Sequence, residues 1–163
     1  MDVKEIQDSQ EVRFAANFQE IETISKIDSC SFYNHYRKEH VERVLRDKKA
    51  FALVVLENQQ LVGFVLYYVD KNHYIICRMA VHPDYRKKGY GKMLLNVLCS
   101  KLSPLKKHVD IVLKESNVGA QQFFKSLNFN AIKIHKNYFT TYHDDLPVVP
   151  YIEDGILFRR MLD

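Results

Sequence analysis

The stretch of sequence that decides the fold is Met79-Ala-Val-His-Pro-Asp-Tyr-Arg-Lys-Lys-Gly-Tyr-Gly-Lys92. In it an apolar run ends, a basic turn with two glycines follows, and an amphipathic helix begins. Backbone N–H groups and the positive end of a helix dipole make such a turn a site for an anion. Gly89 and Gly91 let a phosphate approach the backbone where a Cβ would obstruct it. Positive charge comes from the side chains of Arg86, Lys87, Lys88 and Lys92. The alternative is a solvated basic loop whose glycines serve only the turn.

Two other phosphate-binding motifs are excluded. A Walker A loop needs G-x-x-x-x-G-K-[ST], and Gly91-Lys92-Met93 lacks both the spacing and the hydroxyl. A dinucleotide-binding fold needs G-x-G-x-x-G after its first strand, with an acidic residue further on, and that pattern is absent.

Outward from this turn, the sequence alternates between β-rich runs and helical patterns. Helices are expected over 18–27, 38–45, 89–102 and 117–127, the last with Asn117 as its N-cap. Strands are expected over 11–14, 51–56, 61–69, 74–81, 109–113, 131–135 and 156–161. Residues 57–60 separate two strands as a hairpin turn would. The order predicts a mixed α/β (α+β) layer architecture.

Composition predicts a single soluble domain over 1–163. Hydrophobic residues make up 47% and charged residues 27% of the chain. Three cysteines without a CxxC pair favour a reducing compartment and argue against a disulfide framework or a zinc site. No apolar run has the length of a signal peptide or membrane span, so we expect a cytoplasmic protein that does not contact a membrane. The net charge of +4 comes from 24 basic and 20 acidic interleaved residues, which does not favour nucleic acid as a partner.

The basic turn resembles the pyrophosphate loop of the GCN5-related N-acetyltransferases (GNAT), which has Arg-x-x-Gly-x-Gly after a strand ending Ala-Val-His-Pro. A second block, Asn117 to Phe129, is similar to that family's Asn-x-x-Ala-x-x-x-Tyr-x-x-x-Gly-Phe helix. The resemblance covers roughly residues 51–129. It implies the GNAT fold, a mostly antiparallel mixed sheet whose two parallel central strands splay apart. It also implies acetyl-coenzyme A (acetyl-CoA) as cosubstrate and no metal.

The resemblance also implies roles for individual residues. Backbone groups of the strand end should bind pantetheine, and an N–H aimed at the thioester carbonyl would stabilise the oxyanion. The implied cofactor-binding residues are Met79, Ala80, Val81, Arg86, Lys87, Lys88, Gly89, Tyr90, Gly91, Lys92, Asn117 and Phe124.

Two positions depart from the family pattern. Phe124 stands where the family commonly has a tyrosine that protonates the departing thiolate, and phenylalanine has no proton to give. Asn128 replaces the usual glycine, although asparagine tolerates a left-handed cap. A catalytic acid is therefore not assigned at Phe124, and water can protonate a thiolate of pKa about 8.5.

Tyr74 is the candidate base. In some protein N-terminal acetyltransferases a tyrosine here acts with a histidine or glutamate on the neighbouring strand. The neighbouring position in this chain is expected to be Val112, which cannot serve, so ordered water would assist Tyr74. The alternative is that Tyr74 is simply a strand aromatic. His73, in the turn before it, is a weaker candidate.

The flanking segments resemble the protein N-terminal (ribosomal-protein-alanine type) acetyltransferases. Residues 32–36 are similar to their Phe-x-x-x-Tyr substrate loop, residues 136–139 to their Lys-Asn-Tyr-Tyr, and residues 153–162 to their closing strand. The implied substrate-binding residues are Phe32, Tyr36, Tyr138 and Phe139. Core packing of these aromatics is the alternative. The segment 140–154, with its prolines and acids, is a candidate lid that shapes specificity.

The sequence leaves three functions open. The first is acetyl transfer to a primary amine by direct attack on the thioester, with a protein or peptide N-terminus as acceptor. The second keeps this chemistry but takes a polyamine, an aminoglycoside or an amino acid. The third is a non-catalytic module that binds acetyl-CoA. A monomer and a homodimer are both compatible with the sequence.

Overall fold

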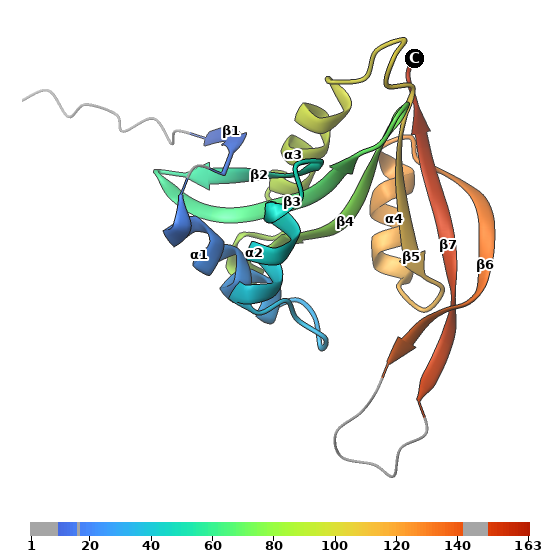
Figure 1. Ribbon diagram of the computed structural model, residues 1–163, viewed down its shortest axis with the longest axis horizontal. Coiled ribbons are helices and arrows are strands. Elements are labelled where there is room, and N and C mark those ends of the chain that lie inside the picture. Colours follow the sequence, from blue (N-terminus) through green and yellow to red (C-terminus); the bar gives the residue numbers. More distant parts are fainter. Residues whose placement is uncertain (1–9, 16, 142–149) are drawn as a thin grey trace, which may run out of the picture. The chain divides into compact units, whose positions relative to one another are not determined.

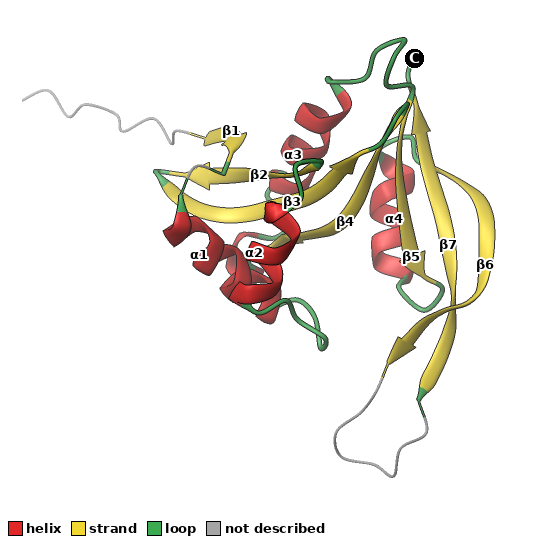
Figure 2. Ribbon diagram, in the orientation of Figure 1, coloured by secondary structure: helices red, strands yellow, loops and turns green. Residues whose placement is uncertain are grey.

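The computed structural model describes residues 10–15, 17–141 and 150–163 (Figures 1 and 2). These residues form two compact units. Unit 1 consists of the described part of Met1–Tyr67 together with Arg78–Ser100, and unit 2 of Tyr68–Cys77 with the described part of Lys101–Asp163. The single-domain interpretation stays a prediction. Among the described residues, none of the helices is both long and apolar enough to cross a membrane.

Unit 1 contains the N-terminal strands and three α-helices. Its elements are β1 (Gln10–Phe14), α1 (Phe18–Ser29), α2 (Lys38–Arg46), β2 (Ala50–Glu57), most of β3 (Gln60–Val69), the end of β4 (His73–Val81), the 3₁₀ helix η1 (Pro83–Tyr85) and α3 (Tyr90–Cys99). The turn between β2 and β3 is the expected hairpin. Asn58 and Gln59 have φ values of 49° and 67°, and a two-residue hairpin turn of type I′ needs positive φ at both positions.

The core of unit 1 follows the apolar periodicity of its helices. α1 begins where the Asn17 side chain accepts a hydrogen bond from Glu20 N at 3.0 Å, and it buries Ile24 and Ile27. α3 buries Leu94, Leu95 and Leu98 completely. Burying each such leucine contributes about 1.5–3 kcal/mol before entropy is counted. α3 is therefore anchored in the core of unit 1, and this packing fixes the position of the turn at its N-terminus.

Unit 2 contains the start of β4 and the C-terminal elements, β5 (His108–Lys114), α4 (Val118–Ser126), β6 (Asn130–Thr141) and β7 (Tyr151–Met161). β4 pairs with β5 in parallel, from His73 opposite His108 to Ile76 opposite Ile111. β7 pairs antiparallel with both β5 and β6. The pairing of β4 with β5 joins the first four residues of each strand, all of which lie in unit 2.

The strands follow the order β1-β2-β3-β4-β5-β7-β6. The β1–β2, β5–β7 and β6–β7 pairs are antiparallel, and β4–β5 is parallel. This mixed sheet and the four α-helices of the described residues confirm the α/β (α+β) fold class.

Three element boundaries differ from the sequence expectation by three residues or more, and one of them is the start of β7, at Tyr151 instead of Ile156. The helix expected over 89–102 ends at Cys99, because a turn with Ser103 and Lys106 bonded to each other follows, and Pro104 disfavours helical geometry before it. The strand expected over 131–135 continues to Thr141. A register shift between His135 and Phe139 interrupts its alternation, which concealed the continuation.

Candidate functional site

The basic turn predicted from the sequence lies between η1 and α3. Arg86, Lys87, Lys88 and Gly89 are all exposed. Gly89 is the N-cap of α3 with a left-handed φ of 91°, which a glycine adopts without strain. The first hydrogen bond of the helix runs from Met93 N to Gly89 O, so the preceding N–H groups have no acceptor within the helix. The turn offers N–H groups and cationic side chains together, as a phosphate site needs.

Arg86 anchors this turn to its surroundings. Its Nε donates to Val81 O at 2.9 Å, and its Nη2 donates to Ser31 Oγ at 2.9 Å. The guanidinium therefore ties the end of β4 and the segment after α1 to the turn. The positive charge of Arg86 adds to that of Lys87 and Lys88, although its Nε and Nη2 atoms already donate to acceptors within the protein.

Tyr90, Ala80 and Gly63 shape the inner side of the turn. Tyr90 is 1% exposed and its hydroxyl donates to Glu57, so its side chain is part of the packing of unit 1. Ala80 is buried, and a Cβ on Gly63 would lie 3.1 Å from Ala80 O. β3 and β4 therefore approach each other closely at Ala80. Met79 and Val81, on either side of it, are half-buried.

Tyr74 is buried in β4, and its hydroxyl donates to Lys101 O at 3.2 Å. Burial raises the pKa of its phenol. Both features favour the protonated form, so acting as a base would cost Tyr74 extra free energy, and this role stays a prediction. The expected strand neighbour is wrong: Tyr74 pairs with Val109, whereas Val112 pairs with Leu157 of β7. Sequence alone does not set the register of a parallel pair.

The second block forms α4 and its ends. Asn117 is the N-cap, and its Oδ1 accepts from Ala120 N at 3.1 Å, as expected. Phe124 is buried, with its ring 5.1 Å from that of Phe129 at an angle of 82°. Asn128 has a left-handed φ of 63°, which confirms that it replaces the usual glycine as a cap.

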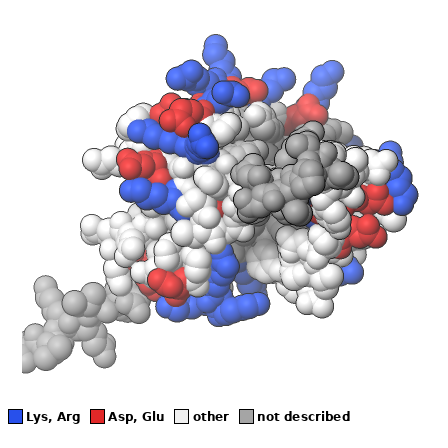
Figure 3. All heavy atoms as spheres, turned by 90° about the horizontal axis from the view of Figure 1, so that it is seen from below, with Lys and Arg blue, Asp and Glu red and all other residues white. Residues whose placement is uncertain are grey.

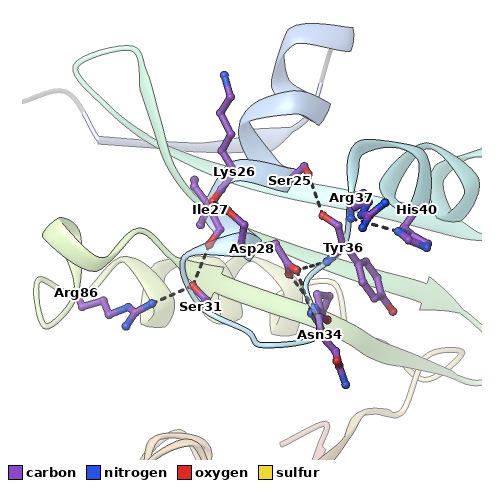
Figure 4. Close-up of polar contacts among 12 residues, drawn as sticks. Ser25, Lys26, Ile27, Asp28, Ser31, Asn34, Tyr36, Arg37, His40 and Arg86 are labelled. Atoms are coloured by element: carbon purple, nitrogen blue, oxygen red, sulfur yellow. Dashed lines mark hydrogen bonds and ion pairs between the residues drawn. The ribbon is translucent and has the colours of Figure 1, made fainter. Parts of the chain in front are cut away.

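In unit 1, Phe32 and Tyr36 lie on a segment that a buried ion pair holds. The Arg78 guanidinium carbon is 3.8 Å from the Phe32 ring centroid and 4.3 Å from the Tyr36 ring centroid. Arg78 forms an ion pair with Asp28 of α1 (Figure 4). The Asp28 side chain is fully buried. Sequence reasoning missed both residues. A signal existed, because Asp28 lies four residues after Ile24 on the apolar stripe of α1.

In unit 2, Tyr138 and Phe139 lie on β6 with their rings 4.9 Å apart, edge to face. Tyr138 is 53% exposed. Gly155 of β7 permits its position, since a Cβ there would lie 3.0 Å from Tyr138 Cβ and 2.7 Å from Val112 Cγ1. The expected lid over 140–154 falls mostly on residues 142–149, which are outside the described part of the chain.

A buried acid lies near Phe139. Glu153 accepts from Ser116 Oγ at 2.6 Å and pairs with Lys114 Nζ at 3.3 Å. Burial pushes the pKa of Glu153 upward, but hydrogen bonds from Ser116 and the charge of Lys114 hold it below its usual value. Glu153 is therefore ionised and a poor base at neutral pH. Lys114 Nζ also lies 5.6 Å from the Phe139 ring centroid.

One group among the described residues has ligand atoms close enough for a metal, namely His73, His108 and Asp110, within 4.8 Å of one another. The two imidazole rings stack at 4.6 Å and 18°. Arg159 holds Asp110 through two hydrogen bonds of 2.8 Å. Burial lowers the pKa of His108, and the charges of Arg159 and His73 lower it further. The carboxylate of Asp110 has the opposite effect, which is smaller than that of burial. Because the guanidinium already satisfies the carboxylate, the group is an ion pair beside stacked rings.

Charges of both signs occur across the face shown in Figure 3, where Lys and Arg alternate with Asp and Glu around large uncharged areas. This distribution matches the interleaved charges of the sequence.

Comparisons with known proteins agree with the two sequence blocks. The Acetyltransferase (GNAT) family model matches residues 18–129. The [ribosomal protein bS18]-alanine N-acetyltransferase of Haemophilus influenzae is 27% identical over 129 residues, which cover 71% of this chain and 86% of that protein. The fold is shared with the solved structure of the Escherichia coli ribosomal-protein-S18-alanine N-acetyltransferase, with a TM-score of 0.77, 19% identity, and coverage of 93% of this chain and 92% of that one. Arabidopsis thaliana NAA60 in complex with acetyl-CoA is also similar, with a TM-score of 0.77, 17% identity, and coverage of 94% and 99%.

Proposed function

The chain belongs to the acetyltransferase (GNAT) family and is an N-acetyltransferase, and on this premise we propose that it moves the acetyl group of acetyl-CoA to the α-amine of a protein N-terminus. The observation that carries the donor half is the exposed cationic turn at the N-terminus of α3. Its left-handed Gly89 and its N–H groups without helical acceptors fit a pyrophosphate. Acetyl-CoA supplies an activated thioester, and the NAA60 structure contains this molecule.

The acceptor half rests on two observations. The relative from Haemophilus influenzae acts on an alanine of a ribosomal protein, and the family match includes the segment that carries Phe32 and Tyr36. Both rings are held on the Arg78 guanidinium, so their positions are fixed before an acceptor arrives. Preorganised aromatic side chains suit the first side chain and backbone of a peptide.

The protonation states of the site also favour an α-amine. An amine attacks only in its neutral form, and Tyr74, with its raised pKa, is a poor base. At pH 7 about 10–17% of an α-amine with pKa about 7.7–8.0 is neutral, against about 0.04% of a lysine amine with pKa about 10.4. At this pH the neutral fraction of an α-amine therefore exceeds that of a lysine amine by a factor of several hundred, which an enzyme with a weak base needs more than one with a strong base.

An acetyl-transfer assay tests the acceptor. The protein is incubated with acetyl-CoA and a pool of peptides, polyamines and aminoglycosides, and acetylation is read by mass spectrometry. Each peptide is paired with an α-formylated copy that keeps its lysines. We expect transfer to free α-amines only. Transfer confined to small amines or lysines would remove the N-terminal proposal, and measurable acetyl-CoA binding without transfer would favour the non-catalytic module.

A pair of lysine variants tests the basic turn over Arg86–Lys92, which we call the donor turn. Lys87→Gln/Lys88→Gln removes two exposed cations from the turn, and Lys48→Gln/Lys49→Gln removes two exposed cations between α2 and β2. We expect only the first variant to raise the KM for acetyl-CoA, with an effect that shrinks at high salt. Equal effects from both variants would indicate a general influence of net charge and would contradict the site.

A further inference from the structure

Asp28 is an acid in the core of unit 1. It lies in the last turn of α1 and is 0% exposed. Arg78 reaches it from β4 with two hydrogen bonds, Nε to Oδ1 at 2.8 Å and Nη2 to Oδ2 at 2.9 Å. Removing two charges from water costs free energy that a buried pair rarely regains. A contribution to stability is therefore a weak reason for this pair to be present.

Both members of the pair also bind the segment between α1 and α2, residues 30–37, which we call the acceptor loop. Tyr36 N donates to Asp28 Oδ2 at 2.5 Å, and Arg78 Nη2 donates to Asn34 O at 2.6 Å. Ser25 Oγ donates to Tyr36 O at 2.9 Å. Figure 4 shows Tyr36 of the loop beside Asp28 of α1, with Ser25 of the same helix bonded to Tyr36. The loop backbone is thus held at Asn34 and at both polar groups of Tyr36.

The same guanidinium supports the side chains of the loop. Its carbon lies 3.8 Å from the Phe32 ring centroid and 4.3 Å from the Tyr36 ring centroid. A planar guanidinium can donate two parallel hydrogen bonds to a carboxylate while its faces stack on aromatic rings. A lysine ammonium cannot do both. One residue of β4 therefore fixes the backbone and both aromatic rings of the acceptor loop.

We propose that Asp28 and Arg78 are positioning residues that set the acceptor loop in its peptide-binding conformation. This inference rests on the proposed function, because it assigns Phe32 and Tyr36 to the acceptor. Neither Asp28 nor Arg78 needs to contact the reacting atoms. They act by holding the loop in order before the acceptor binds. The loop then loses less conformational entropy on binding, and the affinity for the acceptor is higher.

The test replaces both charges at once, because removing one alone would leave an unpaired buried charge. Asp28→Val/Arg78→Met removes the pair and every loop contact it makes. The chain offers a matched control in Asp110→Val/Arg159→Met. This pair joins β5 to β7, and its guanidinium likewise donates two hydrogen bonds to the carboxylate, each of 2.8 Å. Arg78→Lys is a second variant that keeps the charge without the fork, in case the first does not fold.

Three quantities are measured on each variant: the KM for the best peptide acceptor, the KM for acetyl-CoA, and hydrogen exchange of residues 30–37. Releasing two ordered aromatic side chains should raise the peptide KM by about tenfold to a hundredfold. We expect the acetyl-CoA KM to stay within about twofold, since Arg86 keeps its bond to Val81 O even if the loosened loop loses the one from Arg86 to Ser31 Oγ. Exchange in the acceptor loop should become faster, and the control should change neither the peptide KM nor this exchange.

Two results would overturn the proposal: an unchanged peptide KM in the folded variant, or an equal rise in the control. If the wild type acetylates no peptide, the proposed function fails and hydrogen exchange alone decides the inference. Faster exchange of residues 30–37 in Asp28→Val/Arg78→Met but not in the control would then support the positioning role. Unchanged exchange would refute it.

Discussion

Gly89→Ala tests whether the turn before α3 depends on its left-handed residue. Gly89 has a φ of 91°, and a Cβ added there meets no heavy atom within 4 Å. The change therefore introduces backbone strain without a clash. Strain of roughly 1–2 kcal/mol is opposed by a gain of about 0.4–1 kcal/mol from the stiffer unfolded chain. The expected net loss is about 1 kcal/mol, or roughly 2–4 °C in Tm for a chain of this length.

Relaxation of this strain should redirect the N–H groups at the start of α3. Losing one charge-assisted hydrogen bond to a phosphate costs about 1.5–3 kcal/mol, which is roughly a tenfold to hundredfold rise in Kd for acetyl-CoA. Thermal unfolding gives the first quantity and isothermal titration calorimetry gives the second. Both effects must appear together if the left-handed N-cap shapes the anion site.

Gly119→Ala is the matched control. Gly119 lies in α4, also has no heavy atom within 4 Å of an added Cβ, and has no positive φ. Alanine there should stabilise the protein by up to about 1 kcal/mol, because glycine is the poorer helix former. The two alanine variants should therefore shift Tm in opposite directions. Equal Tm values, with an acetyl-CoA Kd for Gly89→Ala within twofold of wild type, would refute the reasoning.

Three further changes test other parts of the molecule. Phe124→Tyr supplies a proton donor at the family's usual position and should raise kcat several-fold, below the roughly 10²-fold of a full general acid; an unchanged steady-state kcat would mean that thiolate protonation does not limit turnover. Gly155→Ala places a Cβ 2.7 Å from Val112 Cγ1 and 3.0 Å from Tyr138 Cβ, so it should cost about 1–3 kcal/mol in urea unfolding and raise the peptide KM. Burial lowers the pKa of His108, so its neutral form stabilises the fold above about pH 6.5, and this contribution is lost as pH falls through the lowered pKa. Unfolding free energies at pH 7.5 and 5.5 should differ more in wild type than in His108→Gln.

Elements with local signals were predictable from the sequence. The cap at Asn117 and the hairpin turn at Asn58 depend on residues within a few positions of each other, and both occur as expected. The turn before α3 was predictable for the same reason, since its charges, glycines and helix start are contiguous, and its role in binding acetyl-CoA stays a prediction. The C-terminal end of α3 is not set by its apolar stripe alone, because Pro104, which lies beyond the stripe, disfavours helical geometry in the residue before it.

Features that depend on strand register or on distant pairs were not predictable. The sequence predicts Val112 as the neighbour of Tyr74, but the parallel pairing places Val109 there. Asp28 and Arg78 are 50 residues apart, so no local pattern connects them. The buried acid was visible on the apolar stripe of α1, yet its partner could be identified only from the folded chain.

Within unit 1, β4 organises both the donor turn and the acceptor loop. Arg78 holds the loop through its side chain, and three residues later Val81 O holds Arg86 at the start of the donor turn. The two connections use different groups of the strand, one a side chain and one a carbonyl. Changes at Arg78 should therefore alter the peptide KM, and changes at Gly89 the acetyl-CoA Kd, with little effect of either on the other. Double-mutant cycles would measure this independence, and a large coupling energy would mean that Arg86 and Ser31 transmit strain between the loops.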